Sequence, residues 1–502
     1  MKKNIIKSLT ITVLALLVII IMVSSLGLSI FKINPVATKY NDELFYLKQI
    51  KSIWLSFAPM GNFGYNESSA LIGGFGAWSP LIAYSYAIFG FVFQNSMHVI
   101  YFTNLFLILI AIFIITYLKK YKFSKSIFFL IPLFNCIVFR HVYSGMSEAL
   151  FYVIGMLIAF LLTKETNKSP LCCGISRASC VGCILILIAS LMRPYFVVFF
   201  PLLVFKEKSI NLKNIGFTTL LIIITIIGYF TVNHYFVAEY LTPLLRFNEI
   251  FDWAIRGNFI SSVVNLMRYI VMNVRTTIYF IKQSTSTGDM VGIIYLLYYL
   301  TTIPLILTIF VQIKDKKSLI SNLFVFLVYI IAYLTIINLY APYQGSRHVF
   351  IFIIFAWYYL ILNNSKIYNI IILSAIVVSC NVIFVRDSYN LYNDEDWSMN
   401  NYINDIKLIE SGGSRVDNTM LIEYGVDNSL YHILYYLNDT ISINLCMSDY
   451  LRNNVDQLNY KYVILSKNSN NISIYKQKHQ TVVENDWFAI YKLESMEKIN
   501  EE

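Results

Sequence analysis

Residues 97–118 read MHVIYFTNLFLILIAIFIITYL and are followed directly by Lys119 and Lys120. At about 1.5 Å per residue, an apolar helix of this length crosses the roughly 30 Å hydrocarbon core of a bilayer. Lysines at the end of such a run are typical of the cytoplasmic side. The stretch therefore predicts a transmembrane helix that ends in the cytoplasm.

The rest of the chain repeats this pattern. Of its 502 residues, 57% are apolar and 14% are charged, and the mean hydropathy is +0.61, whereas a soluble domain carries about 25% charged residues. A soluble globular enzyme is thereby excluded. We predict eleven spans, at residues 9–31, 97–118, 126–139, 146–163, 180–192, 194–205, 215–236, 291–312, 319–340, 348–363 and 367–385.

Charge divides the chain into two parts. Residues 1–386 carry a net charge of +19, and residues 387–502 carry −9. The cations of the first part lie in short clusters between apolar runs, which encodes membrane orientation and not nucleic-acid binding. We expect a multi-pass protein of the cell membrane with a cytoplasmic N-terminus and an extracytoplasmic C-terminal domain.

This charge bias decides two assignments that hydropathy leaves open. The stretch 79–94 is expected to lie along the outer interface, because counting it as a span would put Lys119 and Lys125 outside. The stretch 180–205 is expected to turn back near Arg193 and Pro194; the alternative is one long helix kinked by the proline.

Three segments then lie outside the cell: a first outer loop (32–96), a later outer loop (237–290) and the tail. Within 237–290, residues 261–282 form an amphipathic stretch that predicts an interfacial helix. The tail alternates predicted strands at 420–423, 462–466 and 488–493 with a helical stretch at 430–437. The fold class is thus an all-α polytopic membrane protein of about eleven helices, with a membrane catalytic domain (1–386) and a small mixed α/β domain (387–502).

Acidic residues that could carry chemistry lie in the predicted outer segments. Asp42 and Glu43 precede Leu47 and Ile50 at helical spacing, so Asp42 is either a helix cap or a general base held at the membrane face. Glu148 stands at the outer end of a predicted span, and Glu67 lies in the first outer loop.

Two arginines at predicted outer turns, Arg193 and Arg347, suit a lipid phosphate, which a guanidinium can bind through two parallel hydrogen bonds. Snorkelling toward the headgroups is the alternative. The neighbouring Arg140, Tyr343 and His348, with Glu67, are weaker candidates for substrate binding. The sequence does not decide whether a divalent metal takes part; Asp42 and Glu148 would be its ligands.

The order of these features resembles the GT-C superfamily of glycosyltransferases that use polyprenyl-phosphate sugars, similar to protein mannosyltransferases and the lipid A aminoarabinose transferase. A first span leads to an outer loop with Asn41-Asp42-Glu43 and Tyr46, then to a proline-containing interfacial helix ending in Phe89-Gly90, a basic inner loop, and a second outer turn with an acid. The acidic tail resembles the extracytoplasmic domains often appended to such enzymes.

The resemblance implies roles for individual residues. Asp42 would deprotonate or position the acceptor hydroxyl with Glu43 beside it, Glu148 would be the second-loop acid, and Arg193 and Arg347 would lie near the lipid phosphate. The sequence departs from the family at Trp78-Ser79-Pro80, where many relatives carry a charge before the proline, and at Glu148, where aspartate is more usual.

We therefore expect a membrane glycosyltransferase that moves a hexose or pentose from a polyprenyl-phosphate donor to a cell-surface glycan or lipid acceptor, with inversion at the anomeric carbon. Its partners would be the donor, the acceptor and membrane lipid, without nucleic acid. A flippase or transporter of lipid-linked glycans, a polysaccharide polymerase, and a scaffold or sensor remain as alternatives. Against a transporter, none of the acidic residues in 1–386 lies in the middle of a span.

Overall fold

A computed structural model describes residues 2–25, 42–59, 63–65, 79–379 with short gaps, 405, 419–426, 430, 433 and 442–493 except 459. The gaps within 79–379 are 95, 97, 120, 165–169, 172–174, 208–210, 237–252, 254, 288, 313–315 and 364–366. The chain forms two compact units, which we call the membrane unit (Met1–Ile33, Thr103–Thr231 and Pro243–Asn393) and the second unit (Asn34–Phe102, Val232–Thr242 and Asp394–Glu502).

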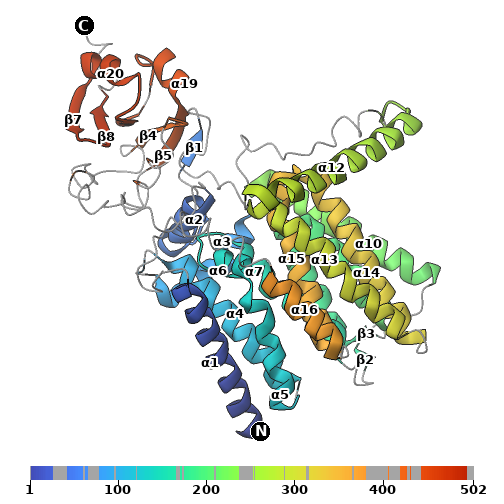
Figure 1. The fold of residues 1–502 in the computed structure, drawn as a ribbon. Helices are drawn as coiled ribbons and strands as arrows, with labels where there is room; N and C mark the ends of the chain where they lie inside the picture. The colour runs from blue at the N-terminus through green and yellow to red at the C-terminus, as the bar shows by residue number, and fades with distance from the viewer. Residues whose placement is uncertain are drawn as a thin grey trace. The chain divides into compact units, whose positions relative to one another are not determined.

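Apolar helices make up the membrane unit (Figure 1). They are α1 (Lys2–Ser25), α4 (Val99–Leu118), α5 (Phe123–Ser126), η2 (Ile127–Phe134), α6 (Cys136–Val142), α7 (Glu148–Thr163), α8 (Arg177–Met192), η4 (Pro194–Phe199), α9 (Phe200–Glu207), α10 (Leu212–Phe236), α12 (Phe259–Thr287), α13 (Met290–Val311), α14 (Lys316–Leu339), α15 (Pro342–Leu362) and α16 (Ile367–Ser379).

Within the described residues, each of the eleven predicted spans overlaps one of these helices or two or three consecutive ones, while residues 26–31 and 380–385 of the predicted spans lie outside the described residues. Among the described residues, six helices are long and apolar enough to cross a membrane, and a pair bent by 76° at Asn135 would be a seventh. The polytopic helical fold is confirmed. The structure adds that α7, α8 and the segment Pro194–Lys206 are shorter apolar helices.

Lysines gather at one end of the membrane unit, which we call the lysine end. Lys7 Nζ donates to the carbonyl of Tyr121 (2.9 Å), Lys119 Nζ to Thr163 (2.6 Å) and Lys206 Nζ to Leu161 (2.9 Å). The chain's N-terminus, α5 and the short hairpin β2 (Pro170–Leu171) and β3 (Ile175–Ser176) lie at this end, at the bottom of Figure 1. The clustering agrees with the loops that the sequence assigns to the cytoplasm, and the side of the membrane itself stays a prediction.

The turn expected at Arg193 is confirmed. Arg193 has an extended backbone (φ −144°, ψ 109°), as the residue before a proline prefers, and Pro194 opens η4. Helices α8 and α9 then pack side by side: a Cβ added at Gly182 would lie 2.4 Å from Leu203 Cδ1. This close approach forms a hairpin whose tip carries Arg193.

Two short helices of the second unit come from the first outer loop. Helix α2 (Asp42–Ser56) packs on α3 (Pro80–Phe89), where Trp54 Nε1 donates to the carbonyl of Ala87 at 3.0 Å. Helix α3 and the turn η1 (Phe91–Phe93) are each too short to cross a bilayer, as expected for residues 79–94.

A six-stranded sheet forms the rest of the second unit, in the order β1-β5-β4-β6-β8-β7. Its strands are β1 (Phe63–Tyr65), β4 (Thr419–Tyr424), β5 (Ser442–Met447), β6 (Tyr462–Ser466), β7 (Gln480–Glu484) and β8 (Phe488–Lys492). The three predicted strands are confirmed, while most of the predicted helix at 430–437 and the expected boundary at 386 lie outside the described residues. Strand β1, from the first outer loop, pairs in parallel with β5.

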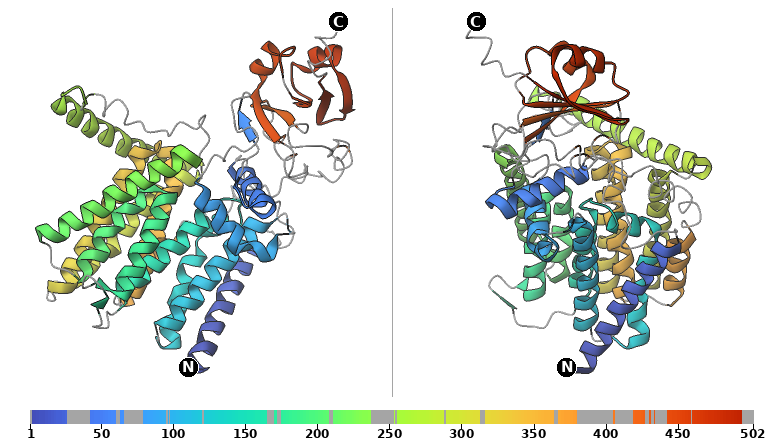
Figure 2. Two further views of the ribbon diagram at one scale, coloured as in Figure 1. Left: turned by 180° about the vertical axis from the view of Figure 1, so that it is seen from behind. Right: turned by 90° about the vertical axis from the view of Figure 1, so that its left-hand side faces the viewer.

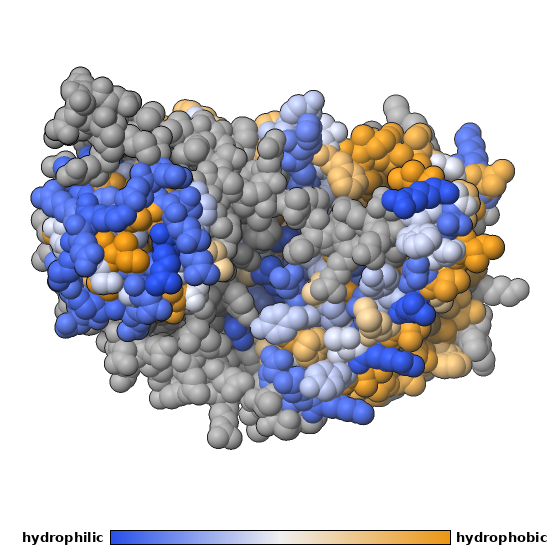
Figure 3. Space-filling view, turned by 90° about the horizontal axis from the view of Figure 1, so that it is seen from above, coloured by the Kyte–Doolittle hydropathy of each residue, from blue (hydrophilic) through white to orange (hydrophobic). Residues whose placement is uncertain are grey.

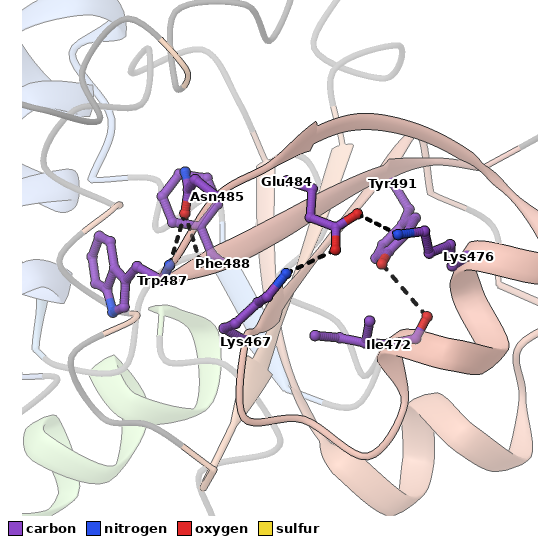
Figure 4. A network of polar contacts seen from close by, with 8 residues as sticks. All are labelled: Lys467, Ile472, Lys476, Glu484, Asn485, Trp487, Phe488 and Tyr491. Carbon is purple, nitrogen blue, oxygen red and sulfur yellow. Dashed lines mark hydrogen bonds and ion pairs between the residues drawn. The ribbon is translucent and has the colours of Figure 1, made fainter.

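Helices α19 (Ser448–Asn453) and α20 (Ile472–Lys478) cover one face of this sheet (Figure 2). Leu451 and Tyr475 from the two helices pack there against Val463 and Tyr491 of the strands. On the surface, Glu484 accepts hydrogen bonds from Lys467 (2.7 Å) and Lys476 (2.8 Å), as Figure 4 shows. A small mixed α/β fold at the C-terminal end of the chain is thereby confirmed.

Candidate active site

Charged residues meet at the end of the membrane unit opposite the lysine end. Helix α7 runs from Glu148 to Thr163, whose carbonyl binds Lys119 at the lysine end. Helix α15 runs from Pro342 to Leu362, whose carbonyl accepts a hydrogen bond from Tyr121 there (2.8 Å). The N-termini of both helices therefore lie at the far end, together with the tip of the α8–α9 hairpin. We call this the arginine end.

Glu148 is the buried acid of the arginine end, with 1% of its surface exposed. Its Oε1 lies 3.6 Å from Nε of Arg347, which comes from the first two turns of α15. Its Oε2 is buried and accepts no hydrogen bond from any described residue. Position in the first turn of α7 also favours the negative charge, because the helix dipole is positive there. One carboxylate oxygen thus remains available to a bound molecule.

Buried hydrogen bonds hold the turn that precedes Glu148. Asn104 Nδ2, on α4, donates to the carbonyls of Ser144 and Met146, both at 3.1 Å. Ser144 Oγ donates to the carbonyl of His141 (3.1 Å) and accepts from the amide of Met146 (3.2 Å). Because every partner is buried, this turn fixes the start of α7 and so the position of Glu148.

Arg193 lies nearly buried at the tip of the hairpin, with 6% of its surface exposed. Its guanidinium carbon stands 5.7 Å from the ring centroid of Phe151, one turn after Glu148 on α7. A cation over an aromatic face is stabilised by the electron density of the ring. The amide of Arg193 closes α8 through Ala189, and its carbonyl opens η4 through Phe196, so both flanking helices position it.

His348 completes the cluster from α15. Its Nδ1 lies 3.2 Å from the hydroxyl of Tyr195, and its ring lies 4.4 Å from that of Tyr340. Its Nε2 is buried without a hydrogen-bond partner among the described residues. A bound oxyanion at this level would face two guanidiniums and one imidazole.

The other predicted residues are placed less centrally. Arg140 is buried beside His141, whose Nδ1 bonds to the hydroxyl of Tyr152. Tyr343 is half exposed in the first turn of α15. Asp42 and Glu43 begin α2, but their side chains, like the whole of Glu67, lie outside the described residues.

Sequence reasoning missed Tyr195, Tyr152 and His141. Each had a local signal: Tyr195 follows Arg193 by two residues, Tyr152 lies one helical turn after Glu148, and His141 is adjacent to Arg140. These aromatic and imidazole groups bond to one another or to the predicted residues, so spacing relative to a charged candidate would have found them.

Among the described residues, no group of three or more His, Cys, Asp or Glu side chains could hold a metal ion. Glu148 could supply one ligand through Oε2. Two arginines and a histidine are side chains that suit a bound anion, and anion binding by them stays a prediction.

No protein-family model matches the sequence, and no curated protein matches it either. Among solved structures, the fold is similar to that of ArnT from Cupriavidus metallidurans, crystallised bound to undecaprenyl phosphate, at 8% identity and a TM-score of 0.47. The match covers 96% of this chain and 97% of that one.

Proposed function

We propose that this protein is a membrane glycosyltransferase that transfers a sugar from a polyprenyl-phosphate donor to a cell-surface glycan or lipid on the outer face of the membrane. The observation that supports this most directly is the meeting of Arg193, Arg347 and Glu148 at one end of an apolar helical unit. A lipid-linked phosphate keeps its tail in the bilayer and its sugar at the interface, and the proposal places these side chains next to that phosphate.

Arg193 and Arg347 would bind the phosphate and stabilise the charge that develops as it leaves. Glu148 holds Arg347 by the 3.6 Å ion pair, and its second oxygen can accept a hydrogen bond from a sugar hydroxyl. Since the cluster is buried, these interactions act in a medium of low polarity, where charge stabilisation is stronger than in water.

Asp42 would serve as the general base, as the resemblance to the GT-C superfamily implies, with Glu43 beside it. The acceptor oxygen attacks the anomeric carbon and passes its proton to the Asp42 carboxylate. The bond between that carbon and the phosphate oxygen breaks, and the electron pair leaves with the lipid phosphate. Attack opposite the leaving group inverts the anomeric carbon. No step requires a metal.

Asp42→Asn tests the base. In the purified full chain, we expect transfer from a polyprenyl-phosphate sugar to fall about 10³-fold, since general base catalysis typically contributes 10²- to 10⁴-fold. The matched control is Asp449→Asn, an exposed carboxylate in the first turn of α19. Full transfer by Asp42→Asn would remove the proposed base.

Arg347→Gln and Arg193→Gln test phosphate binding separately from chemistry. Each is expected to weaken binding of undecaprenyl phosphate, measured without sugar transfer, by about tenfold or more, because a charged hydrogen bond contributes about 1.5–3 kcal/mol. Arg452→Gln in α19 is the control. Unchanged phosphate binding in both variants would leave the enzymatic proposal without its anion site and would favour a transporter.

A further inference from the structure

Helix α12 (Phe259–Thr287) differs in composition from the other long helices of the membrane unit. Like those helices it contains no aspartate or glutamate, but along its 29 residues the cations Arg268, Arg275 and Lys282 recur every seventh position. A seven-residue spacing drifts by only about 20° per repeat around a helix, so these cations share one side. The helix thus presents a continuous positive edge.

The polar side chains of α12 attach it to the rest of the membrane unit. Asn273 Nδ2 donates to Asn338 Oδ1 on α14 (2.9 Å), and Thr277 Oγ1 bonds to the hydroxyl of Tyr333 (2.8 Å). The apolar side chains face away from these contacts and stay exposed by 44–59%: Val263, Val264, Met267, Val271 and Ile278. This inverts the arrangement of a water-soluble helix and suits a helix whose free side meets lipid.

A shallow, open groove lies on this exposed side, and the described residues that line it all belong to α12. Arg268 and Arg275 lie on it with Thr276 and Tyr279, and its apolar lining comes from Met267, Val271 and Met272. Both arginines are exposed. Two cations with hydroxyl groups beside a methionine and valine surface match the two halves of a phospholipid, a phosphate with a polar headgroup and the start of an acyl chain.

The position of α12 agrees with this chemistry. The helix lies across the upper end of the membrane unit in Figures 1 and 2, at the end opposite the lysines. Phe280 contacts Tyr343 in the first turn of α15, with ring centroids 6.3 Å apart. Seen from above in Figure 3, hydrophilic and apolar side chains are interspersed over the right-hand part of the molecule. Headgroups of the surrounding leaflet would lie at this level.

We propose that the outer side of α12 binds an anionic glycerophospholipid, with the phosphate between Arg268 and Arg275 and the upper acyl chain along Met267, Val271 and Met272. A free phosphate would leave the apolar part of the groove exposed to water, and a neutral lipid would leave the cations without a counter-charge. This lipid is neither the sugar donor nor the acceptor, so the site would exist whether or not the chain transfers sugars.

Native mass spectrometry of the full chain in detergent measures this binding directly. With phosphatidylglycerol as the probe, we expect Arg268→Gln/Arg275→Gln to weaken the tightest site on the order of 30-fold, since each cation near an anionic surface contributes about fivefold. Arg268→Lys/Arg275→Lys should retain most of the binding. Arg256→Gln, an exposed arginine in the turn before α12 and outside the groove, is the matched control.

Three further measurements can overturn the proposal. Equal binding of phosphatidylcholine and phosphatidylglycerol would show that the site does not distinguish an anionic lipid from a zwitterionic one. Competition by inorganic phosphate alone would point to a free anion, and competition only by undecaprenyl phosphate would assign the groove to a polyprenyl carrier. Because Arg268 and Arg275 are exposed, the glutamine variants are expected to unfold at the wild-type temperature, which separates lost binding from lost folding.

Discussion

Two buried carboxylates, one in each unit, differ in how completely they are bonded. In the second unit, Glu423 is fully buried and accepts hydrogen bonds from Ser469 Oγ (2.6 Å), Ser448 Oγ (2.8 Å) and the amide of Ser466 (3.1 Å), with Asn471 Nδ2 at 3.4 Å. In the membrane unit, Glu148 is as deeply buried but has a 3.6 Å ion pair and a second oxygen that no described residue binds.

The difference distinguishes a buried carboxylate that stabilises the fold from one that is placed to bind a substrate. A buried charge costs several kcal/mol unless hydrogen bonds and counter-charges compensate it, and donors from three segments surround Glu423. Glu148 is compensated only in part, which favours a role in which a bound substrate supplies the remaining partner. Glu423 instead connects the ends of β4 and β6 to α19 and α20, so its role is to hold the sheet domain together.

Among tests of these two carboxylates, the largest expected effect is on catalysis by Glu148→Gln. Removing the charge releases Arg347 from its orienting partner, and we expect sugar transfer to fall about 10²- to 10³-fold, as for other preorganised polar groups at reacting centres. The assay is transfer from a polyprenyl-phosphate sugar by the full chain, with thermal unfolding measured in parallel. If Glu148→Gln transfers sugar at the wild-type rate, Glu148 has no catalytic role that distinguishes it from Glu423.

Glu423→Ala is expected to act on stability and not on catalysis. It leaves buried serine and asparagine donors without an acceptor, and the free energy of unfolding should fall by about 3 kcal/mol. Differential scanning calorimetry of the full chain measures this, and the transfer rate of the molecules that remain folded should be unchanged. A large loss of rate at unchanged stability would mean that Glu423 also contributes to the active site.

Tyr195→Phe gives a smaller effect at the arginine end. It removes the hydroxyl that lies 3.2 Å from His348 Nδ1 while keeping the aromatic packing. One hydrogen bond contributes about 1–1.5 kcal/mol, so we expect roughly a tenfold loss in transfer. Tyr475→Phe, which removes a buried hydroxyl from α20, is the control and should leave the rate unchanged.

The smallest effect is expected at the exposed carboxylate of Glu484 (Figure 4). Hydrogen bonds from Lys467 and Lys476 lower the pKa of Glu484 to about 2. Because this pKa is depressed on folding, its contribution to stability is present above about pH 4.3, the ordinary value for glutamate, and is lost as the pH falls toward 2.

Glu484→Gln should therefore lower the unfolding temperature slightly at pH 7 and not at all near pH 2. High salt at pH 7 should remove most of the difference, since the ion pairs are at the surface. Unfolding temperatures of the wild type and the variant, measured over a range of pH and salt concentration, give the contribution of this exposed carboxylate to stability. A difference that persists in high salt would contradict the surface assignment.

The sequence predicted the parts of the fold that depend on local pattern. The length of the apolar runs predicted where the helices lie, and the lysine clusters predicted which loops lie at the same end. Pro194 predicted the turn at Arg193. Each of these signals is contained in a short stretch of sequence. Strand β6 falls on the predicted residues 462–466 because its apolar run is short and bounded. The pairing of β1 with β5 could not be predicted, since Phe63–Tyr65 carries no signal for a partner almost four hundred residues away.

At the candidate site, the sequence predicted the members but not their contacts. Glu148, Arg193, Arg347 and His348 were chosen for their residue type at outer turns. Their meeting depends on how α7, the α8–α9 hairpin and α15 pack, which is a property of the fold. The role of Asp42 opposite the arginines stays a prediction, because its side chain lies outside the described residues.

Helices α7 and α8 have 16 residues each and so are roughly 24 Å long, about one helical turn less than the hydrocarbon thickness of a typical bilayer. If the lysine end lies at one membrane surface, Glu148 at the start of α7 and Arg193 after the end of α8 would lie about one helical turn short of the opposite headgroups. A bilayer responds to such mismatch by thinning locally. The phosphate of the polyprenyl donor would then lie closer to Glu148 and Arg193, so local thinning of the membrane would favour substrate binding.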